Sequence, residues 1–519
     1  MSLNKRFFVT TPIYYVNDLP HIGHTYTTVA ADVVSRWRRL MGDDVLFLTG
    51  TDEHGAKILE AAAGKKKDVR EYCDEIAAGF KNAWKNMGIS YDIFIRTTDL
   101  LHEDAVRKFT GGLNEKKELN FSKYEGRYCI QCEKYLTETE LSDGLCPDHK
   151  TKPVVQSEEN YFFNLSKYRD KLLEIIQDTC HPQHFEILPA ERKNEITGKL
   201  KKGLDDISIS RAEMPWGIPL PFDPGQTVYV WVDALINYIS AVGYGLPGQK
   251  NLNYAFSDWW PADVHIIGKD ILWFHCVIWP ALLLASGLTL PKKIFAHGYF
   301  TVNGQKMSKT VGNVIRPAEL IDIFGADASR FLLLAAFPFG SDGDISLDDF
   351  REKYNAYLAD NIGNLISRTT NMVEKYLGGR LTVPAGWTDS NLQEIRQLFS
   401  EAAEGLESLS FEKTIRSIIS MSTFCNQYID REEPWRLASS VAPSDRQKLQ
   451  KILYDVILVL KHITLLLAPL MPETSAKIWG LLDEKEEMAA VIRGMRDKPG
   501  LSLPSGAEIK KSPPLFPKQ

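Results

Sequence analysis

The first fifty residues constrain the fold of this 519-residue chain more than any other segment. They begin with a short apolar run, Arg6 to Thr11, of the kind that forms a buried parallel strand. Pro20 then opens a segment whose apolar residues recur at helical spacing up to Gly42, and Val45 to Gly50 is a second apolar run. This order predicts a βαβ unit with a right-handed crossover. Ligands of such units lie beyond the carboxyl ends of the strands and near helix N-termini.

The pattern changes twice along the rest of the chain. We expect several domains, because 519 residues exceed one ordinary hydrophobic core. From about residue 118 to 230 the alternation breaks among cysteines, prolines and turn residues, which indicates an inserted module. The α/β pattern resumes with a strand at Val264–Gly268, a buried helix from Ile271 to about Gly287, and a strand at Ile294–Phe300.

Residues beyond about 351 show a helical pattern. Strand signals nearly vanish there, and a bundle is predicted by four amphipathic stretches, at 351–378, 389–407, 411–431 and 444–482. The polar, proline-rich end is expected to be a tail that packs back through Leu515 and Phe516. The expected α/β domain has two halves, at 1–117 and 231–350, with an insertion between them at 118–230. The bundle is expected at 351–483 and the tail at 484–519.

Composition narrows the class of protein. A hydrophobic content of 44% and a charged content of 25% are those of a soluble globular chain. The net charge of −6 provides no overall basic field, so contact with nucleic acid would need local patches. Seven cysteines, only three of them clustered, indicate a reducing compartment. Without a secretory signal or membrane span, we expect a cytoplasmic protein, in the bacterial cytosol rather than the mitochondrial matrix.

The first candidate site is His21-Ile22-Gly23-His24, at the expected start of the first helix. Histidines three residues apart share one helical face, and the free N–H groups of a helix N-terminus attract anions. Gly23 would let a phosphate or a planar ring approach the backbone. The motif suits the binding of a triphosphate, although a metal pair or two unrelated surface histidines would give the same residues.

The second candidate is Lys306-Met307-Ser308-Lys309-Thr310, just after the turn signal Asn303-Gly304. Two lysines three residues apart on a loop suit a mobile cationic clamp on a polyphosphate. An isolated pair of this kind is more often a solvated basic loop.

The third candidate is a cluster of metal-ligand type. Its residues form two close pairs on either side of a short loop: Cys129 and Cys132, then Cys146 and His149. This spacing and these ligands favour a tetrahedral, structural Zn²⁺ site. Reduced thiols on a loop are the alternative, and Asp148 is a weaker substitute for His149.

The histidine and lysine motifs together resemble the two signatures of class I aminoacyl-tRNA synthetases, usually written HIGH and KMSKS. Thr310 stands in place of the final serine and keeps its hydroxyl. Further segments are similar to the methionyl-tRNA synthetase family, over essentially the whole chain: residues 12–17, 51–55, 230–238 and 265–275. The resemblance implies a Rossmann-type parallel-sheet catalytic domain with a zinc-bearing connective insertion, followed by an α-helical bundle.

The resemblance also implies the roles of individual residues. The methionine pocket would consist of Ile13, Tyr15, Trp231, Ala234, Tyr238 and His275, with Asp52 on the substrate ammonium. Aromatic edges suit a thioether, and a tyrosine hydroxyl or an imidazole could donate a proton to the sulfur. The ATP site would consist of His21, Gly23, His24, Gly268, Asp270, His297, Gly298, Lys306 and Lys309, with Arg211 near the reacting phosphates. Without the resemblance, Trp231 and Tyr238 would be read as the core face of a helix.

In the bundle, the resemblance implies an anticodon-reading set of Asn364, Arg368 and Trp435. A Trp can stack on an unpaired base, while Asn and Arg hydrogen-bond to base edges. Asp360 occupies a position where the family has asparagine. A tryptophan packed inside the bundle is the alternative interpretation.

The expected reaction has two steps: methionine and ATP give methionyl-adenylate and pyrophosphate, and methionine is then transferred to initiator or elongator methionine tRNA. We expect Mg²⁺ to bind with the pyrophosphate, a structural Zn²⁺ site and a monomeric protein. We also expect homocysteine to be rejected by an editing reaction in the methionine pocket. The alternatives are another class I synthetase (cysteinyl, valyl or isoleucyl), a nucleotidylyltransferase, and an inactive tRNA-binding protein with this fold.

Overall fold

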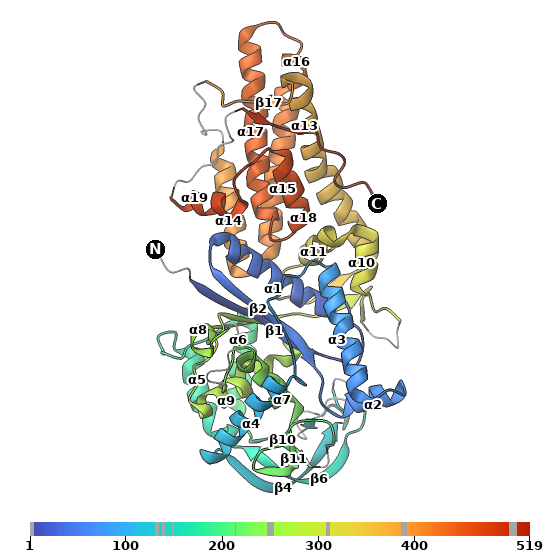
Figure 1. Cartoon of the computed structure of the whole chain (residues 1–519), viewed down its shortest axis with the longest axis vertical. Coiled ribbons are helices and arrows are strands. Elements are labelled where there is room, and N and C mark those ends of the chain that lie inside the picture. Colours follow the sequence, from blue (N-terminus) through green and yellow to red (C-terminus); the bar gives the residue numbers. More distant parts are fainter. Residues whose placement is uncertain are drawn as a thin grey trace.

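The computed structural model describes residues 5–129, 134–136, 141–147, 150–212, 214–245, 254–307, 312–385, 392–497 and 506–519. A six-stranded parallel sheet forms the centre of the α/β body, in the order β3-β2-β1-β12-β13-β7 (Figure 1). Its strands are β1 (Arg6–Tyr15), β2 (Asp44–Asp52), β3 (Ile93–Arg96), β7 (Glu186–Leu188), β12 (Val264–Gly268) and β13 (Lys293–His297). The strand order reverses between β1 and β12, and at such a switch point a crevice opens beyond the carboxyl ends of the strands.

The predicted βαβ unit is confirmed. Helix α1 (Ile22–Met41) follows β1 and leads into β2, which pairs with β1 in parallel. Strand β1 continues beyond the predicted Thr11 to Tyr15, and its register with β2 shifts between Thr10 and Ile13. Pro12 lies inside this irregularity, as expected for a residue that cannot donate a ladder hydrogen bond.

Helices cover both faces of the sheet. On one face lie α1 and α3 (Val69–Asn86), in a core that continues into the bundle. On the other face lie α4 (Leu100–Glu115), α7 (Val230–Ser240) and α9 (Trp279–Ser286). The predicted buried helix after Ile271 is confirmed, with a π-helical turn at Phe274–Ile278 before α9.

The range 118–230 contains a second, antiparallel sheet, in the order β5-β4-β6-β8. It is formed by β4 (Leu119–Cys129), β5 (Lys134–Leu136), β6 (Val154–Phe163) and β8 (Ile207–Ser208). A three-stranded sheet follows, formed by β9 (Ser210–Ala212), β10 (Pro219–Leu220) and β11 (Asp223–Val228). The same range contains the helices α5 (Arg169–Gln177) and α6 (Ala190–Lys202). Strand β7 comes from the same range but pairs with β13, so this range also supplies an edge of the central sheet.

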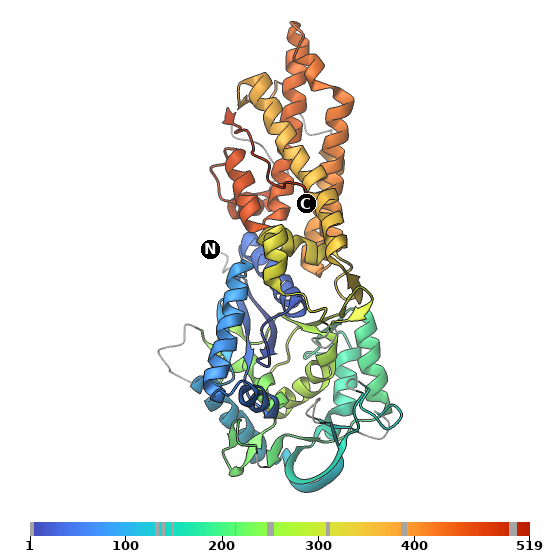
Figure 2. The same ribbon diagram turned by 90° about the vertical axis from the view of Figure 1, so that its right-hand side faces the viewer.

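The chain beyond residue 346 is almost entirely helical, as predicted. Its helices are α12 (Leu347–Lys353), a π-helical segment (Tyr354–Gly363), α13 (Asn364–Leu377), α14 (Gln393–Ser408), α15 (Phe411–Glu432), α16 (Pro434–Leu437), α17 (Pro443–Leu467), α18 (Pro472–Leu481) and α19 (Met488–Asp497). The predicted stretch 444–482 consists of two helices, because Pro469 and Pro472 interrupt the helical hydrogen bonds. Figures 1 and 2 show the bundle standing on the α/β body, with α1 at the boundary.

The end of the chain packs back on the bundle, as predicted. Strand β18 (Ala507–Glu508) pairs with β17 (Arg380–Leu381), and Phe516 belongs to the core of the bundle. Between body and bundle, α10 (Pro317–Phe324) and α11 (Ala326–Ala335) follow the hairpin of β14 (Phe300–Val302) and β15 (Gln305–Lys306). Among the described residues, no helix is long and apolar enough to cross a membrane.

Candidate active site

A cavity of about 850 Å³ opens at the carboxyl ends of β1 and β12, where the strand order reverses. Fourteen of the predicted site residues line it: Ile13, Tyr15, His21, Gly23, His24, Asp52, Trp231, Ala234, Tyr238, Gly268, Asp270, His275, His297 and Gly298. These residues come from six separate stretches of sequence, and the fold brings them to one place. This cavity therefore coincides with the site predicted from the sequence.

The histidine motif caps the N-terminus of α1. Nδ1 of His21 accepts the Gly23 N–H at 3.1 Å, and Nδ1 of His24 accepts the His21 N–H at 3.3 Å. The two rings stack at 3.8 Å, and burial, with a smaller effect of His21, lowers the pKa of His24 well below its usual value. Because each Nδ1 accepts a backbone N–H, each neutral ring carries its proton on Nε2 as a donor. The helix N-terminus thus presents two imidazole donors beside its own positive dipole.

Glycines line the cavity next to these donors. A Cβ on Gly268 would lie 2.4 Å from Oδ1 of Asp270, and a Cβ on Gly298 would lie 2.2 Å from the Ser341 carbonyl oxygen. No larger side chain fits at either position without a shift of its neighbours. A flat ligand can therefore approach the backbone closely at this end of the cavity.

His297 is held rigidly beside Gly298. Its ring bonds through Nδ1 to the Gly298 carbonyl oxygen at 2.8 Å and through Nε2 to Oγ1 of Thr27 at 2.6 Å. Burial lowers its pKa to about 4, so the ring is neutral at pH 7. Nδ1 is then the donor to the carbonyl, and Nε2 accepts from the threonine hydroxyl.

The other end of the cavity is aromatic. Trp231 stacks on Phe274 with ring centres 4.5 Å apart, and the Tyr238 hydroxyl lies 2.7 Å from Nε2 of His275. Nδ1 of His275 faces the Ile271 carbonyl oxygen at 2.9 Å, and burial lowers the pKa of this histidine to about 4. The neutral ring therefore donates to Ile271 and accepts from Tyr238.

This pairing bears on one expectation about the pocket, which stays a prediction. The tyrosine hydroxyl or the imidazole was expected to donate a proton to a ligand sulfur. In this structure the proton of each group is directed to an acceptor within the protein. The pair acts instead as a fixed polar wall behind the aromatic rings.

Asp52 ends β2 and is 3% exposed, and the loop that follows it is held from several sides. The Glu53 carboxylate accepts from Arg96 at 2.7 and 2.9 Å and from Thr98 at 2.6 Å. The Glu53 carbonyl oxygen accepts from the Trp216 indole. The position of Asp52 in the cavity is thus fixed by its neighbours in the loop.

A buried His–Asp–His network joins this loop to α7. Asp233 Oδ2 lies 2.7 Å from Nδ1 of His54, and Oδ1 lies 2.7 Å from Nε2 of His102. Burial alone would raise the pKa of Asp233, but the two histidines outweigh it and lower the pKa. Asp233 lies between Trp231 and Ala234 in sequence, so one carboxylate connects the wall of the aromatic end to the Asp52 loop. The sequence placed Asp233 in a matching segment but gave no sign of its partners.

The lysine motif begins in the β14–β15 hairpin, and the predicted turn at Asn303-Gly304 is confirmed. Asp344 holds this turn, because its Oδ1 accepts the Gly304 N–H at 2.8 Å and the Thr301 hydroxyl at 2.6 Å. Lys306 lies in β15 and Met307 lines the cavity. Lys309 and the Lys306 side chain lie outside the described part of the structure, so their predicted role stays a prediction.

Arg211 is not among the residues that line this cavity, and its role near the reacting phosphates stays a prediction. It lies in β9, where it donates to Oγ of Ser208 at 2.8 Å and to the Ser210 carbonyl oxygen at 2.9 Å. Its guanidinium also stands 4.4 Å from the centre of the Tyr229 ring. These contacts hold Arg211 beside a smaller hollow with His54 and Trp216.

The predicted zinc ligands are only partly described. Cys129 and Cys146 are buried, pack against each other with Leu141, and form no disulfide. Cys132 and His149 lie outside the described residues, and those residues contain no group of three metal-ligating side chains. Two thiols from opposite ends of the predicted loop are thus brought together.

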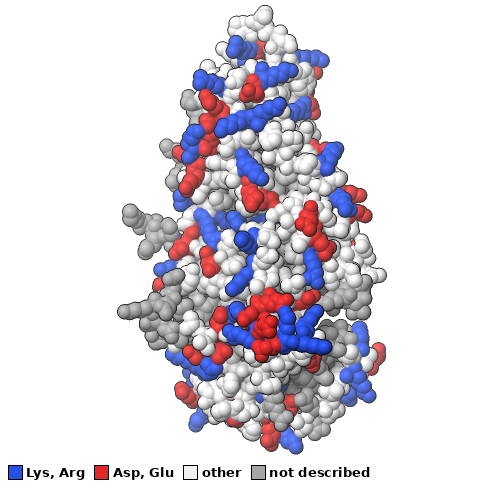
Figure 3. All heavy atoms as spheres, turned by 45° about the vertical axis from the view of Figure 1, so that its right-hand side comes forward, with Lys and Arg blue, Asp and Glu red and all other residues white. Residues whose placement is uncertain are grey.

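The predicted anticodon-reading residues share one surface of the bundle. Arg368 forms an ion pair with Asp430 and stands 5.6 Å from the ring centre of Trp435, which is 37% exposed. Asn364 is exposed four residues before Arg368, and Asp360 pairs with Lys518 at 2.8 Å. On the face shown in Figure 3, basic and acidic side chains are interspersed, in line with a net charge of −6.

Comparison with known proteins identifies relatives over the whole chain. The family model for class I tRNA synthetases of the M type matches residues 7–151 and 138–370, and the model for the anticodon-binding domain of tRNA ligases matches residues 390–493. The chain is 44% identical to the methionine–tRNA ligase of Caldanaerobacter subterraneus subsp. tengcongensis, covering 99% of this chain and 79% of that protein. It is 41% identical to the methionine–tRNA ligase of Streptomyces coelicolor, in a match that covers 99% of this chain and 97% of that protein.

A solved structure has the same fold. The Mycobacterium tuberculosis methionyl-tRNA synthetase in complex with methionyl-adenylate superposes with a TM-score of 0.92 at 36% identity. The match covers 99% of this chain and all of that chain.

Proposed function

The chain belongs to the methionyl-tRNA synthetases of class I, and we propose that the cavity beyond β1 and β12 is where it activates methionine. The enzyme is a methionine–tRNA ligase, which forms methionyl-adenylate from methionine and ATP and then transfers methionine to tRNA. The observation that carries the assignment to this cavity is the convergence on it of fourteen residues expected in the methionine and ATP sites.

Methionine is proposed to bind at the aromatic end. Its side chain would lie against Trp231, Ala234 and Tyr238, with Ile13 and Tyr15 opposite, because thioethers make favourable contacts with ring edges. The Tyr238–His275 pair provides a wall of fixed shape, which suits selection by size. Asp52 is proposed to bind the substrate ammonium, since a carboxylate buried at a strand end favours a cation.

ATP is proposed to bind at the glycine-rich end. The adenine would approach the backbone at His297-Gly298, and the ribose hydroxyls would donate to Asp270 beside Gly268. This arrangement leaves the triphosphate at the N-terminus of α1. There the Nε2–H donors of His21 and His24 and the helix dipole can stabilise negative charge.

Adenylate formation is proposed to need no protein nucleophile. A methionine carboxylate oxygen attacks the α-phosphorus in line, and pyrophosphate leaves. Charge develops on phosphate oxygens, where His21 and His24 would donate from one side and Lys306 and Lys309 would close from the other. In the second step a hydroxyl of the terminal tRNA adenosine attacks the acyl carbon and AMP leaves.

Two metals are proposed to take part. Mg²⁺ would be held mainly by the pyrophosphate oxygens and water and would neutralise their charge. The cavity carboxylates of Asp342 and Asp344 already accept from Lys269, Tyr299, Thr301 and Gly304, so they form no ready-made cage. Zn²⁺ would be held by Cys129, Cys132, Cys146 and His149, a closed structural set, and the adjacent buried thiols of Cys129 and Cys146 fit it.

Recognition of the tRNA is proposed to involve the far end of the bundle. Trp435 has exposed ring surface for stacking on an anticodon base, and Asn364 and Arg368 would bind base edges. Arg368 would exchange its ion pair with Asp430 for the base. Asp360 is paired with Lys518 and would contribute less. The domain limits given above, a monomeric state and a bacterial cytosolic location are proposed with this function.

The test is charging of tRNA. Purified enzyme, ATP, Mg²⁺, labelled methionine and tRNA should give acid-precipitable methionyl-tRNA. Asp52→Asn should raise the KM for methionine by about 10-fold or more, because it removes a charge-assisted contact worth about 1.5–3 kcal/mol. The KM for ATP should change little. Folded enzyme that charges no tRNA with methionine would refute the proposal, and an Asp52→Asn variant with unchanged methionine KM would refute the ammonium site.

A further inference from the structure

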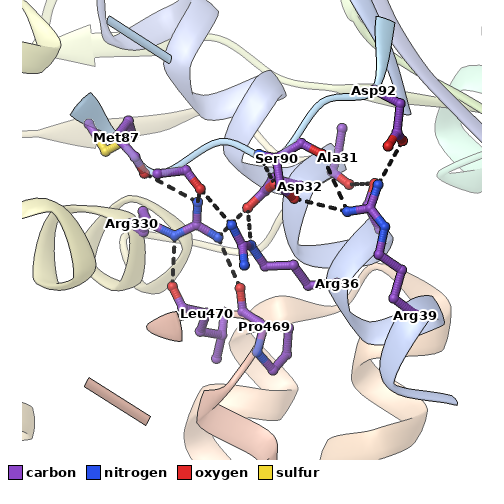
Figure 4. Close-up of polar contacts among 12 residues, drawn as sticks. Ala31, Asp32, Arg36, Arg39, Met87, Ser90, Asp92, Arg330, Pro469 and Leu470 are labelled. Carbon is purple, nitrogen blue, oxygen red and sulfur yellow. Dashed lines mark hydrogen bonds and ion pairs between the residues drawn. The ribbon is translucent and has the colours of Figure 1, made fainter. Parts of the chain in front are cut away.

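Arg330 of α11 lies fully buried where the α/β body meets the bundle (Figure 4). Its Nε donates to the Leu470 carbonyl oxygen and its Nη2 to the Pro469 carbonyl oxygen, each at 2.9 Å. These two carbonyls belong to the turn between α17 and α18. The guanidinium therefore holds the backbone of the bundle.

The same guanidinium also holds the body. Its Nη2 lies 2.6 Å from Oδ2 of Asp32 in α1, and its Nη1 donates to the Met87 carbonyl oxygen after α3 at 3.3 Å. One planar group thus connects α1, the end of α3 and the α17–α18 turn, and Figure 4 shows these segments converging on it. A rigid fork with five donors is suited to this use, whereas an ammonium group is a point charge.

Asp32 makes the arrangement specific. It is fully buried and also accepts from Arg36 Nε at 2.7 Å and from the Ser90 hydroxyl at 2.6 Å. Burial alone would raise its pKa, but Arg330 and Arg36 outweigh this effect and lower the pKa to about 2. Both members of the Arg330–Asp32 pair are therefore charged at pH 7. Buried charges tolerate little displacement, because each lost partner leaves a charge without compensation.

A second contact of α11 strengthens the junction. Asp327, three residues before Arg330, accepts the Thr474 N–H at the start of α18. The α17–α18 turn is thus held at two points by one helix. Among the described residues, Arg36 forms hydrogen bonds with Asp32 and Gly88 in the body and none with the bundle, so it provides a natural control.

The geometry amplifies small movements at this junction. Helix α17 has 25 residues and runs from the α16 end of the bundle, which carries Trp435, to the turn that Arg330 holds (Figure 1). A tilt of about 5° at one end of such a helix, about 37 Å long, moves the other end by about 3 Å. A displacement of this size is about as large as the donor–acceptor distance of a hydrogen bond.

We propose that Arg330 is a positioning residue for tRNA charging: it fixes the bundle on the catalytic body, so that one tRNA can engage Trp435 and the cavity together. This inference rests on the proposed function. Adenylate formation uses only the cavity, so it does not depend on the distance between the cavity and Trp435. Transfer to tRNA needs both ends placed at once, and small misplacement of a reacting group is costly.

The experiment compares Arg330→Lys with Arg36→Lys in the full chain. Both substitutions keep a positive charge near Asp32, but only the first removes the fork that reaches Pro469 and Leu470. Arg330→Met is a further variant that removes the charge as well. Methionine-dependent ATP–pyrophosphate exchange and tRNA charging are measured on each folded protein, together with charging of an RNA minihelix that has the acceptor end but no anticodon.

For Arg330→Lys we expect exchange and minihelix charging within about 2-fold of wild type, and kcat/KM for full tRNA at least about 10-fold lower. Arg36→Lys should leave all three within about 2-fold. Equal loss in the two lysine variants, or parallel loss of exchange and tRNA charging at position 330, would overturn the proposal. If Arg330→Lys proves insoluble, the same comparison applies to Arg330→Met. Absence of exchange in the wild type would instead refute the proposed function.

Discussion

The buried carboxylate of Asp233 offers a sharp test of how the methionine end is held. Its two oxygens bond His54 and His102 at 2.7 Å each, and the side chain is 1% exposed. Asp233→Asn keeps the shape but replaces one oxygen with an NH₂ group that faces an imidazole donor. A hydrogen bond to a charged group contributes about 1.5–3 kcal/mol. We expect the free energy of unfolding to fall by about 2 kcal/mol, because one imidazole can change tautomer and recover part of the loss.

The substitution should also affect binding. Asp233 fixes α7, which carries Trp231 and Ala234, to the loop that carries Asp52. If about 1.4 kcal/mol of this loss of about 2 kcal/mol is expressed in the geometry of the pocket, KM for methionine should rise by about 10-fold, since 1.4 kcal/mol corresponds to a factor of ten. KM for ATP should change by less than about 3-fold, because the glycine-rich end has its own supports at His297 and Gly298.

The assay is ATP–pyrophosphate exchange at varied methionine and ATP, with urea unfolding of the same preparations. Asp263→Asn is the matched control, since Asp263 bonds the Phe8 N–H near the start of β1, far along the strand from the cavity. It should lower stability without changing KM for methionine. If Asp233→Asn loses stability while its methionine KM stays within 2-fold of wild type, the reasoning about α7 is refuted.

Four further outcomes are expected. Lys309→Ala should slow single-turnover adenylate formation by about 100-fold, as loss of one preorganised charge donor does; an unchanged rate would remove the lysine from the mechanism. Because burial lowers the pKa of His275 to about 4, the unfolded chain binds a proton that the folded chain does not between pH 6.5 and 4. As the pH is lowered from 6.5 to 4, the free energy of unfolding should therefore decrease by about 1.4 kcal/mol per pH unit because of this group. His275→Gln should show a shallower dependence of urea unfolding on pH. Cys146→Ser should reduce the zinc content of purified protein from one atom per chain, and wild type without zinc would contradict the site. Trp435→Ala should raise KM for tRNA by about 10-fold or more while exchange stays unchanged, given about 1–3 kcal/mol for one stacked base.

The sequence predicted those features that depend on local patterns. The apolar runs around Phe8 and Val45, with a helix between them, were enough for the βαβ unit. The histidine motif was correctly placed at the start of α1, because helix N-termini and strand ends have local signals. The helical bundle also followed from periodicity, although the stretch 444–482 is divided into two helices at Pro469.

Features that depend on pairing across the chain could not be predicted. Asp233 gains its role from His54 and His102, and Arg330 from Asp32 and the Leu470 carbonyl, and no periodicity signals such partners. The contacts of Arg211 with Ser208, Ser210 and Tyr229 were likewise not visible in the sequence. Buried polar networks are specified by three-dimensional proximity, so they become visible only in the fold.

ATP–pyrophosphate exchange with each of the twenty amino acids in turn, without tRNA, tests the central claim most directly. The reaction returns labelled pyrophosphate to ATP only when an enzyme forms an aminoacyl-adenylate reversibly. The cavity described above predicts exchange with methionine and not with the other nineteen. Exchange driven by a different amino acid would contradict the assignment of the aromatic end, and no exchange in folded protein would contradict adenylate formation itself.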